Sequence, residues 1–244
     1  MSTTTSHHPG LYQGCLFALD DPTCDDTFAG RVRIALDDTS WVDIVPRWMR
    51  GADLVFGELV ARLPWAQREV VMYDRMLPEP RLTAWWSAGH GEPDALSVLA
   101  DARQQLSRRY ARPFDTIGFN LYRDGRDSVT WHSDSERYVH EDPVVAIVSV
   151  GAPRAFHMRP RTGIAGEHQQ FLVGQGDLLV MGGSCQHDWE HAVPKVAHAA
   201  GPRLSIMFRH HRSDLDDGVP PGSPPGAVVT VRRDDGPARR HVRR

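Results

Sequence analysis

Polar and apolar residues alternate through much of the second half of the chain. In segment 203–209, Leu204, Ile206 and Phe208 alternate with Arg, Ser and Met residues. A period of two is typical of a β-strand whose two faces have different surroundings. Short segments of this kind, or short apolar runs bounded by Gly, Pro and Asp, lie at residues 116–122, 129–133, 144–150, 155–158, 170–173, 177–181, 190–193 and 204–208. Eight such strands predict a mainly β protein built as a closed or double-sheet jelly roll.

The first half of the chain has helical periodicity in two places. Between Leu96 and Tyr110 apolar residues recur at helical spacing, which predicts an amphipathic helix over residues 94–111. A second helix is predicted over residues 50–62, because Pro64 provides a stop signal. Residues 30–36 alternate and predict a strand, and residues 11–19 predict another short one. We expect both helices to flank the jelly roll.

Composition changes near both ends of the chain. Residues 1–27 predict a weakly ordered N-terminal segment, whereas residues 213–244 are rich first in Pro and Gly and then in Arg. A segment so poor in large apolar residues is typical of disorder. The chain has 244 residues, 41% of them hydrophobic, enough to bury one substantial core. We therefore predict a single domain over residues 28–212.

Cysteine content and hydropathy indicate the cellular setting. The three cysteines are too few and too scattered for a disulfide framework, which favours a reducing cytosol and a cytoplasmic protein. Cys185 is interpreted as a small buried residue. No signal peptide is recognised and no apolar run is long enough to span a bilayer, so no membrane association is expected. We expect a monomer.

The net charge of −3 argues against a protein that coats nucleic acid by bulk electrostatics. A local basic rim for phosphates is a separate possibility. The residues that would form it are Arg68, Arg75, Arg81, Arg123 and Arg126. The same residues fit scattered, solvated side chains equally well, and the sequence leaves both interpretations open.

A His-x-Asp pair, His132 and Asp134, carries the clearest candidate chemistry. Alternate side chains of a strand share a face, so these two can point at one spot. With a second histidine they would form a two-His-one-carboxylate set, which leaves open positions on Fe(II). His187 and His191 both follow a strand and the Gly182-Gly183 turn, and residue chemistry alone does not separate them.

Two arginines share a face of the last predicted strand. Arg203 and Arg209 lie on the side opposite Leu204, Ile206 and Phe208. A guanidinium stays charged and is costly to bury unpaired, so both need anionic partners. A dicarboxylate co-substrate would supply two carboxylates for forked hydrogen bonds.

Several motifs occur together in one order along residues 63–209. They are Leu63-Pro-Trp65, Pro80-Arg-Leu-Thr83, Asn120-x-Tyr122, His132-x-Asp134, Trp189-x-His191 and Arg203-x-Ser205-x-Met207-x-Arg209. In this combination the chain resembles the AlkB family of 2-oxoglutarate- and Fe(II)-dependent dioxygenases, whose double-stranded β-helix agrees with the predicted jelly roll. The family pattern usually has Asn and Thr where this chain has Ser205 and Met207.

The resemblance implies a role for each matching residue. His132, Asp134 and His191 would bind iron, with His191 preferred to His187 because the family ligand lies between Trp189 and Pro194. Asn120, Tyr122, Arg203 and Arg209 would hold 2-oxoglutarate. Of the arginines, Arg203 would take the remote carboxylate, and Arg209 would lie nearer the iron. Trp131 is expected to point into the opposite core, and His210 to be solvated.

The resemblance also implies the reaction. Such enzymes use dioxygen and 2-oxoglutarate to demethylate bases of the 1-methyladenine and 3-methylcytosine type in DNA or RNA, releasing formaldehyde. The base must leave the stack and be held by flat faces. In the substrate-covering segment near 65–90, Trp86 is our preferred stacking residue, with Trp85 packing inward. Glu136 would read the exocyclic amine, and Arg81 would contact the substrate.

Two other classes of function remain open at this stage. A related 2-oxoglutarate oxygenase acting on a protein or small molecule would keep the iron and arginine sets but would not need a stacking tryptophan. A non-catalytic cupin-like metal-binding module would need only His132, Asp134 and His191, and the arginine pair would then have no role.

Overall fold

The computed structural model describes residues 21–72, 75–87, 97–134, 140–197 and 200–210. Its helices are α1 (Ala52–Arg62), α2 (Ser97–Tyr110) and the short α3 (Cys185–Asp188). Its strands are β1 (Thr23–Cys24), β2 (Val32–Ala35), β3 (Ser40–Val45), β4 (Met49–Arg50), β5 (Glu69–Met72), β6 (Arg75–Pro78), β7 (Leu82–Ser87), β8 (Thr116–Tyr122), β9 (Val129–His132), β10 (Val145–Gly151), β11 (Arg154–Pro160), β12 (Gln169–Val173), β13 (Asp177–Gly183), β14 (Trp189–Val193) and β15 (Arg203–Arg209).

Two antiparallel sheets form the body of the protein. The larger sheet has the order β2-β3-β13-β10-β15-β8-β7, and the smaller has the order β12-β11-β14-β9. Neighbouring strands are often far apart in the chain, as expected for a jelly roll. The ribbons β1–β4 and β5–β6 are separate two-stranded sheets. The predicted fold class, mainly β with a double-stranded β-helix and flanking helices, is confirmed.

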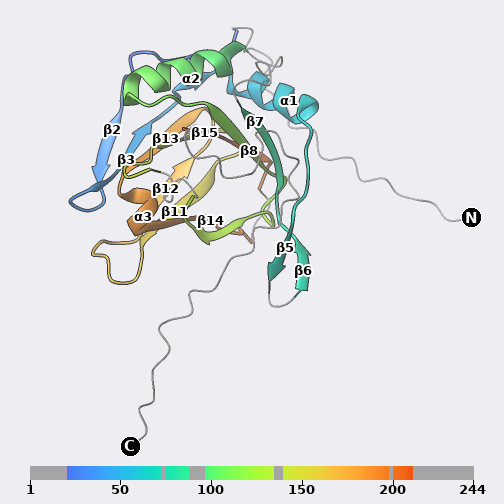
Figure 1. Cartoon of the computed structure of the whole chain (residues 1–244). Coiled ribbons are helices and arrows are strands. Elements are labelled where there is room, and N and C mark those ends of the chain that lie inside the picture. Colours follow the sequence, from blue (N-terminus) through green and yellow to red (C-terminus); the bar gives the residue numbers. More distant parts are fainter. Residues whose placement is uncertain (1–20, 73–74, 88–96, 135–139, 198–199, 211–244) are drawn as a thin grey trace, which may run out of the picture.

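The large sheet has a different apolar layer on each face. One layer joins it to α1 and α2, which lie together on one side of the sheets in Figure 1, and includes Leu59, Leu99 and Ile206. The second layer lies between the sheets and includes Ile147 from the large sheet and Phe156 from the small one. Ile147 and Phe156 of this second layer also line the cavity that contains the candidate site.

The eight strands predicted after residue 113 are all present, with ends shifted by no more than two residues. Both helices are present where they were predicted, as far as the described residues extend. The segment 11–19 lies outside those residues. Among the described helices, none is long and apolar enough to cross a membrane.

Strand β3 was not predicted, and Asp43 at its centre explains why. A charged residue interrupts the apolar pattern, yet Asp43 is fully buried. Arg31 and Arg33 donate to its carboxylate at 2.7–3.1 Å, and the Tyr110 hydroxyl donates at 3.1 Å. Because its partners come from a neighbouring strand and a distant helix, local sequence does not reveal that this carboxylate is internal.

Candidate active site

Three metal-ligating side chains meet inside the fold. His132 ends β9, Asp134 follows two residues later, and His191 lies on β14 directly opposite His132. One ligand atom from each lies within 4.8 Å of the other two. Among the described residues, this is the group of three or more His, Cys, Asp or Glu side chains close enough to hold a metal. The structure thus brings together the three residues that the sequence singled out.

A β-bulge in β9 determines which side chains face the interior. His132 is opposite His191 and Val129 is opposite Val193, so three steps along β9 match two along β14. The extra residue lets Val129 and His132 line the same cavity. Trp131 belongs to neither core layer and is half-buried among polar rings instead. Trp131 faces away from the cavity, but on that side of β9 it meets the rings of His157 and His168, so the prediction that it points into the opposite core was wrong.

Both imidazoles are prepared to act as neutral ligands. The Nδ1 atom of His132 lies 2.8 Å from the Thr130 carbonyl oxygen. A carbonyl only accepts, so Nδ1 carries the proton and Nε2 keeps its lone pair for a metal. Burial, and then the neighbouring His132 ring, lower the pKa of His191 to about 3. A neutral His191 therefore also has a lone pair to offer.

Asp134 completes the set as a charged carboxylate with one oxygen open. Its burial opposes ionisation, but Arg209 and the two histidines lower its pKa to about 2. Arg209 donates to Oδ1 at 2.7 Å, and the Gln186 side chain accepts from the Asp134 backbone N–H at 2.9 Å. Oδ2 is buried without a hydrogen-bond partner in the described structure and lies 3.9 Å from His191 Nε2. Two imidazoles and this oxygen fit an Fe(II) ion.

His187 lies outside this cluster. Its Nε2 is 3.1 Å from the carbonyl oxygens of His140 and Glu141. Both partners are acceptors, so the ring donates to the loop that follows Asp134 rather than pointing at the metal position. This geometry favours His191 as the third ligand.

The cluster lies in a cavity of about 220 Å³ between the two sheets. Its walls combine apolar side chains of the inner layer with polar groups from both sheets and from the segment before β7. The lining residues are Arg68, Arg81, Thr83, Trp85, Asn120, Tyr122, Val129, His132, Ser133, Asp134, Ile147, Phe156, His191, Val193, Ser205, Met207 and Arg209. A mostly pre-formed pocket with a few convergent polar groups is typical of a small-molecule site.

The two arginines of β15 share a face, as predicted, but only Arg209 is among the residues that line the cavity. Arg209 lines the cavity and binds Asp134. Arg203 is fully buried and donates to the Ser149 hydroxyl at 2.7 Å, and its guanidinium lies 5.3 Å from the centre of the Tyr122 ring. Its Nε and Nη1 have no hydrogen-bond partner in the described structure. Burial lowers the pKa of Arg203 to about 10, which is consistent with a cation that lacks an anionic partner.

Asn120 and Tyr122 project from β8, opposite Ser205 and Arg203 respectively. Both line the cavity. At the two positions that depart from the family pattern, Ser205 is small and buried, and the Met207 sulfur accepts weakly from the Asn120 amide at 3.4 Å. A thioether therefore replaces a polar group between Asn120 and Arg209.

The two tryptophans of β7 have the opposite orientation to the one predicted. Trp85 lines the cavity and is 51% exposed, and the Arg209 guanidinium lies 5.2 Å from the centre of its ring. Trp86 packs against the core under α2, with Arg103 5.3 Å from its ring. The choice of Trp86 as the residue facing the pocket was wrong. Alternation along a strand shows that the two differ, but not which one faces inward.

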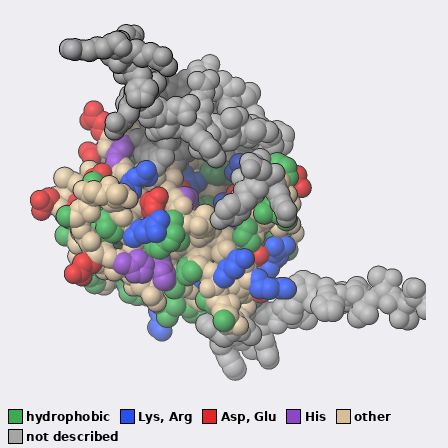
Figure 2. Space-filling model, turned by 90° about the horizontal axis from the view of Figure 1, so that it is seen from below, with side chains coloured by type: hydrophobic (Ala, Val, Ile, Leu, Met, Phe, Trp, Pro, Cys, Tyr) green, Lys and Arg blue, Asp and Glu red, His purple; other side chains and the backbone are tan. Residues whose placement is uncertain are grey.

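The basic rim is only partly present. Arg68 and Arg81 line the cavity, and Arg81 also lies 3.2 Å from the Glu79 carboxylate. Arg123 and Arg126 are paired with Asp127 and Asp124 at 2.7 Å each. Figure 2 likewise shows basic side chains as separate groups with acidic ones beside them, not as a continuous band. The side chain of Arg75 and all of Glu136 lie outside the described residues.

His210 and Cys185 are not among the residues that line the cavity, and both had a predicted environment. His210 was expected to be solvated, and that was wrong: it is 4% exposed, and its Nε2 accepts from the Val144 backbone N–H at 2.9 Å. Cys185 is buried, and burial raises the pKa of its thiol to about 12, as expected for an unreactive residue.

Sequence reasoning missed Gln186, which supports Asp134, because no local pattern marks a glutamine whose partner is 52 residues away.

Comparison with known proteins places this chain among oxygenases. Residues 87–213 match the family described as "2OG-Fe(II) oxygenase superfamily". A mouse protein named "Alpha-ketoglutarate-dependent dioxygenase alkB homolog 3" is 34% identical over 177 residues, which cover 66% of this chain and 62% of the relative. The human protein of the same name is 33% identical over the same shares. An Arabidopsis thaliana protein named "DNA oxidative demethylase ALKBH2" is 28% identical over 190 residues, covering 63% and 60%. The chain thus matches about three fifths of the length of these relatives.

Proposed function

Because the chain belongs to the AlkB family of Fe(II)- and 2-oxoglutarate-dependent dioxygenases, we propose that it oxidatively demethylates nucleobases of the 1-methyladenine and 3-methylcytosine type in DNA or RNA. The observation that carries this proposal is one cavity that holds both the metal-ligand set and a half-exposed tryptophan. A cupin-like module would require only the ligands, whereas the buried Arg203 with unpartnered donors favours a bound dicarboxylate.

Three side chains would bind the metal, and Arg209 would orient one of them. His132 through Nε2, His191 and Asp134 through Oδ2 would hold Fe(II). Bound Fe(II) with 2-oxoglutarate and dioxygen supplies the oxidising power that hydroxylates the methyl carbon, and the hydroxymethyl base then loses formaldehyde. Arg209 fixes the Asp134 carboxylate through Oδ1 and so leaves Oδ2 directed at the metal position.

The cavity walls would orient both reactants. Asn120, Tyr122, Arg203 and Arg209 would take 2-oxoglutarate. Arg203 is buried beyond the residues that line the cavity, and its donors without a hydrogen-bond partner would be directed to the remote carboxylate. Trp85 would stack on the extruded base near the cavity mouth, where Arg68 and Arg81 supply positive charge for phosphates. The apolar walls, Val129, Ile147 and Phe156 among them, keep water from the reacting carbon. Glu136 remains our proposal for the contact to the exocyclic amine.

The test is a panel of single- and double-stranded DNA and RNA oligonucleotides carrying one 1-methyladenine or 3-methylcytosine. With Fe(II) and 2-oxoglutarate, we expect mass loss of the methyl group, with formaldehyde and succinate formed in equal amounts. Succinate without demethylation on every oligonucleotide would instead favour an oxygenase of proteins or small molecules. Metal binding with no succinate under any condition would favour a non-catalytic module.

A further inference from the structure

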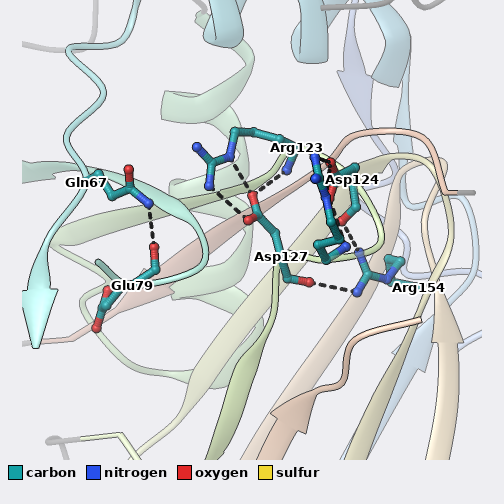
Figure 3. A network of polar contacts seen from close by, with 7 residues as sticks. Gln67, Glu79, Arg123, Asp124, Asp127 and Arg154 are labelled. Atoms are coloured by element: carbon teal, nitrogen blue, oxygen red, sulfur yellow. Dashed lines mark hydrogen bonds and ion pairs between the residues drawn. The ribbon is translucent and has the colours of Figure 1, made fainter. Parts of the chain in front are cut away.

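Arg154, the first residue of β11, is a buried cation whose hydrogen bonds in the described structure are all to backbone carbonyls. It is 2% exposed. Its Nη1 donates to the Asp124 carbonyl at 3.0 Å, and its Nη2 donates to the carbonyls of Asp127 and Pro194 at 3.0 and 2.7 Å. Figure 3 shows Arg154 reaching the turn that carries Asp124 and Asp127. One guanidinium thus holds three backbone oxygens from two separate segments of the chain.

Each of these carbonyls belongs to a residue within two positions of one that lines the cavity. Asp124 follows Tyr122 by two residues, Asp127 precedes Val129 by two, and Pro194 directly follows Val193. Tyr122, Val129 and Val193 all line the cavity. Arg154 therefore holds the ends of β8, β9 and β14 together from behind the cavity wall.

The turn held by Arg154, residues 124–128, also forms hydrogen bonds with Arg123, Pro80 and Val196. The Arg123 side chain and backbone N–H donate to the Asp127 carboxylate at 2.7–2.9 Å (Figure 3). The Ser128 N–H donates to the Pro80 carbonyl at 2.8 Å, and the Val196 N–H donates to the Gly125 carbonyl at 2.9 Å. The acidic side chains of this turn form ion pairs with Arg123 and Arg126, whereas the hydrogen bonds of Arg154 are to neutral carbonyls; Asp127 and Asp124 favour the Arg154 charge only through space.

Arg154 also acts on the arginine proposed for the remote carboxylate. The guanidinium groups of Arg154 and Arg203 lie 5.9 and 5.3 Å from the centre of the Tyr122 ring. In the described structure neither is in an ion pair, and Arg203 keeps two unpartnered donors. Two buried guanidinium groups thus flank the ring of Tyr122, which lines the cavity; Asp127 and Asp124 act on Arg154 from the turn, and a bound carboxylate would supply the counter-charge for Arg203.

We propose that Arg154 is a positioning residue that fixes the closed end of the 2-oxoglutarate pocket and thereby selects the length of the dicarboxylate. The inference rests on the proposed function. Arg154 does not touch the co-substrate. It acts through Tyr122 and the strand ends, which set how far the remote carboxylate lies from the metal ligands.

The experiment compares Arg154→Gln and Arg154→Lys with Arg159→Gln. Arg159 lies on the same strand, is exposed and pairs with Glu190 away from the cavity, so it controls for loss of an arginine from β11. Each protein is assayed with methylated oligonucleotide and either 2-oxoglutarate or its one-carbon-longer homologue 2-oxoadipate. The readouts are KM and kcat for each oxoacid, KM for the oligonucleotide, and the thermal unfolding midpoint.

In both Arg154 variants we expect KM for 2-oxoglutarate to rise by about tenfold or more, with kcat at saturation nearly unchanged. The preference for 2-oxoglutarate over 2-oxoadipate should fall several-fold, while KM for the oligonucleotide stays constant. Lysine should not restore the preference, because an ammonium on an unforked stem does not reproduce three fixed contacts. Arg159→Gln should match the wild type.

Unchanged KM and unchanged preference in folded Arg154 variants would overturn the proposal and leave a purely structural role. If neither variant folds, the wild type still decides: equal use of both oxoacids would show that no closed end selects length. A wild type that turns over neither oxoacid would contradict the proposed function itself, which is a separate outcome.

Discussion

Replacing Trp85 with alanine tests the assignment that the structure reversed. The indole is 51% exposed at the cavity, so its loss should scarcely affect folding stability. Stacking of a base on an aromatic ring is worth about 1–3 kcal/mol. That range corresponds to a fall of about 5- to 150-fold in kcat/KM for a methylated oligonucleotide. Because every base has a flat face, 1-methyladenine and 3-methylcytosine substrates should lose activity alike.

The assay measures demethylation by mass spectrometry and succinate formation without nucleic acid, side by side. Arg209 lies over the Trp85 ring at 5.2 Å, a contact worth about 0.5–1 kcal/mol when exposed. Uncoupled succinate formation should therefore change by no more than a few-fold. Trp85→Phe keeps a stacking face and should recover most of the demethylation.

Trp86→Ala is the matched control from the same strand. Trp86 packs against the core, so its truncation should lower stability, although by less than the roughly 3–5 kcal/mol of a fully buried tryptophan. At temperatures where the variant is folded, its activity should be near that of the wild type. Full activity in Trp85→Ala, together with a specific loss in folded Trp86→Ala, would refute the assignment of the stacking face.

Three further outcomes are expected. His191→Ala should abolish stoichiometric Fe(II) binding in anaerobic titration, whereas His187→Ala should retain it, and the reverse result would exclude the ligand assignment. Gly118→Ala would place a methyl group 3.2 Å from three side chains of the cavity wall, so we expect kcat/KM to fall by about tenfold; an unchanged value would show that those side chains yield freely. The pKa of Asp37 is lowered to about 2, since hydrogen bonds, first from the Trp189 indole, outweigh its burial. A depressed carboxylate pKa stabilises the fold above about pH 4, and this contribution is lost as the pH falls toward 2. Asp37→Asn should therefore be less stable than wild type by about 1–2 kcal/mol at pH 6, and urea unfolding should show this difference in the free energy of unfolding closing by pH 2. A difference that does not change with pH would contradict the prediction.

Period-two segments were predictable because their two faces meet different surroundings. In β15, Leu204, Ile206 and Phe208 face the helices, while Met207 faces the small sheet. Both layers are apolar, yet the polar residues interspersed on one face preserve the alternation. The same reasoning failed for β3, where the buried Asp43 depends on partners from other elements.

Site residues were predictable where chemistry and motif agree, and less so where local geometry decides. His132, Asp134 and His191 are of a residue type and order that few other functions require. The direction of Trp85 and Trp86 depends on where β7 starts its alternation, which is set by pairing with β8. Trp131 faces away from His132 as alternation requires, but its neighbours His157 and His168 come from other parts of the chain, so local sequence does not reveal that this face is polar.

Contacts with neighbouring strands determine the direction in which the two arginine side chains of β15 point, which the sequence pattern alone does not give. Residues six apart on a strand are separated by about 20 Å, too far for two guanidinium groups to hold one five-carbon dicarboxylate if both side chains stand upright. Arg203, however, donates to Ser149, which is opposite Ser205 rather than opposite Arg203 itself.

Arg209 leans in the other direction along the strand. Its Nη2 lies 3.8 Å from the Met207 sulfur, and its Nη1 lies 3.2 Å from the Cβ position of Gly118, which is opposite Met207. Both guanidinium groups therefore incline toward positions 205 and 207, which are about 7 Å apart along the strand. The two departures from the family pattern occupy these positions. Ser205 is small and buried, and the Met207 sulfur contacts Arg209, so we expect both arginines to bind 2-oxoglutarate in spite of the two replaced polar side chains.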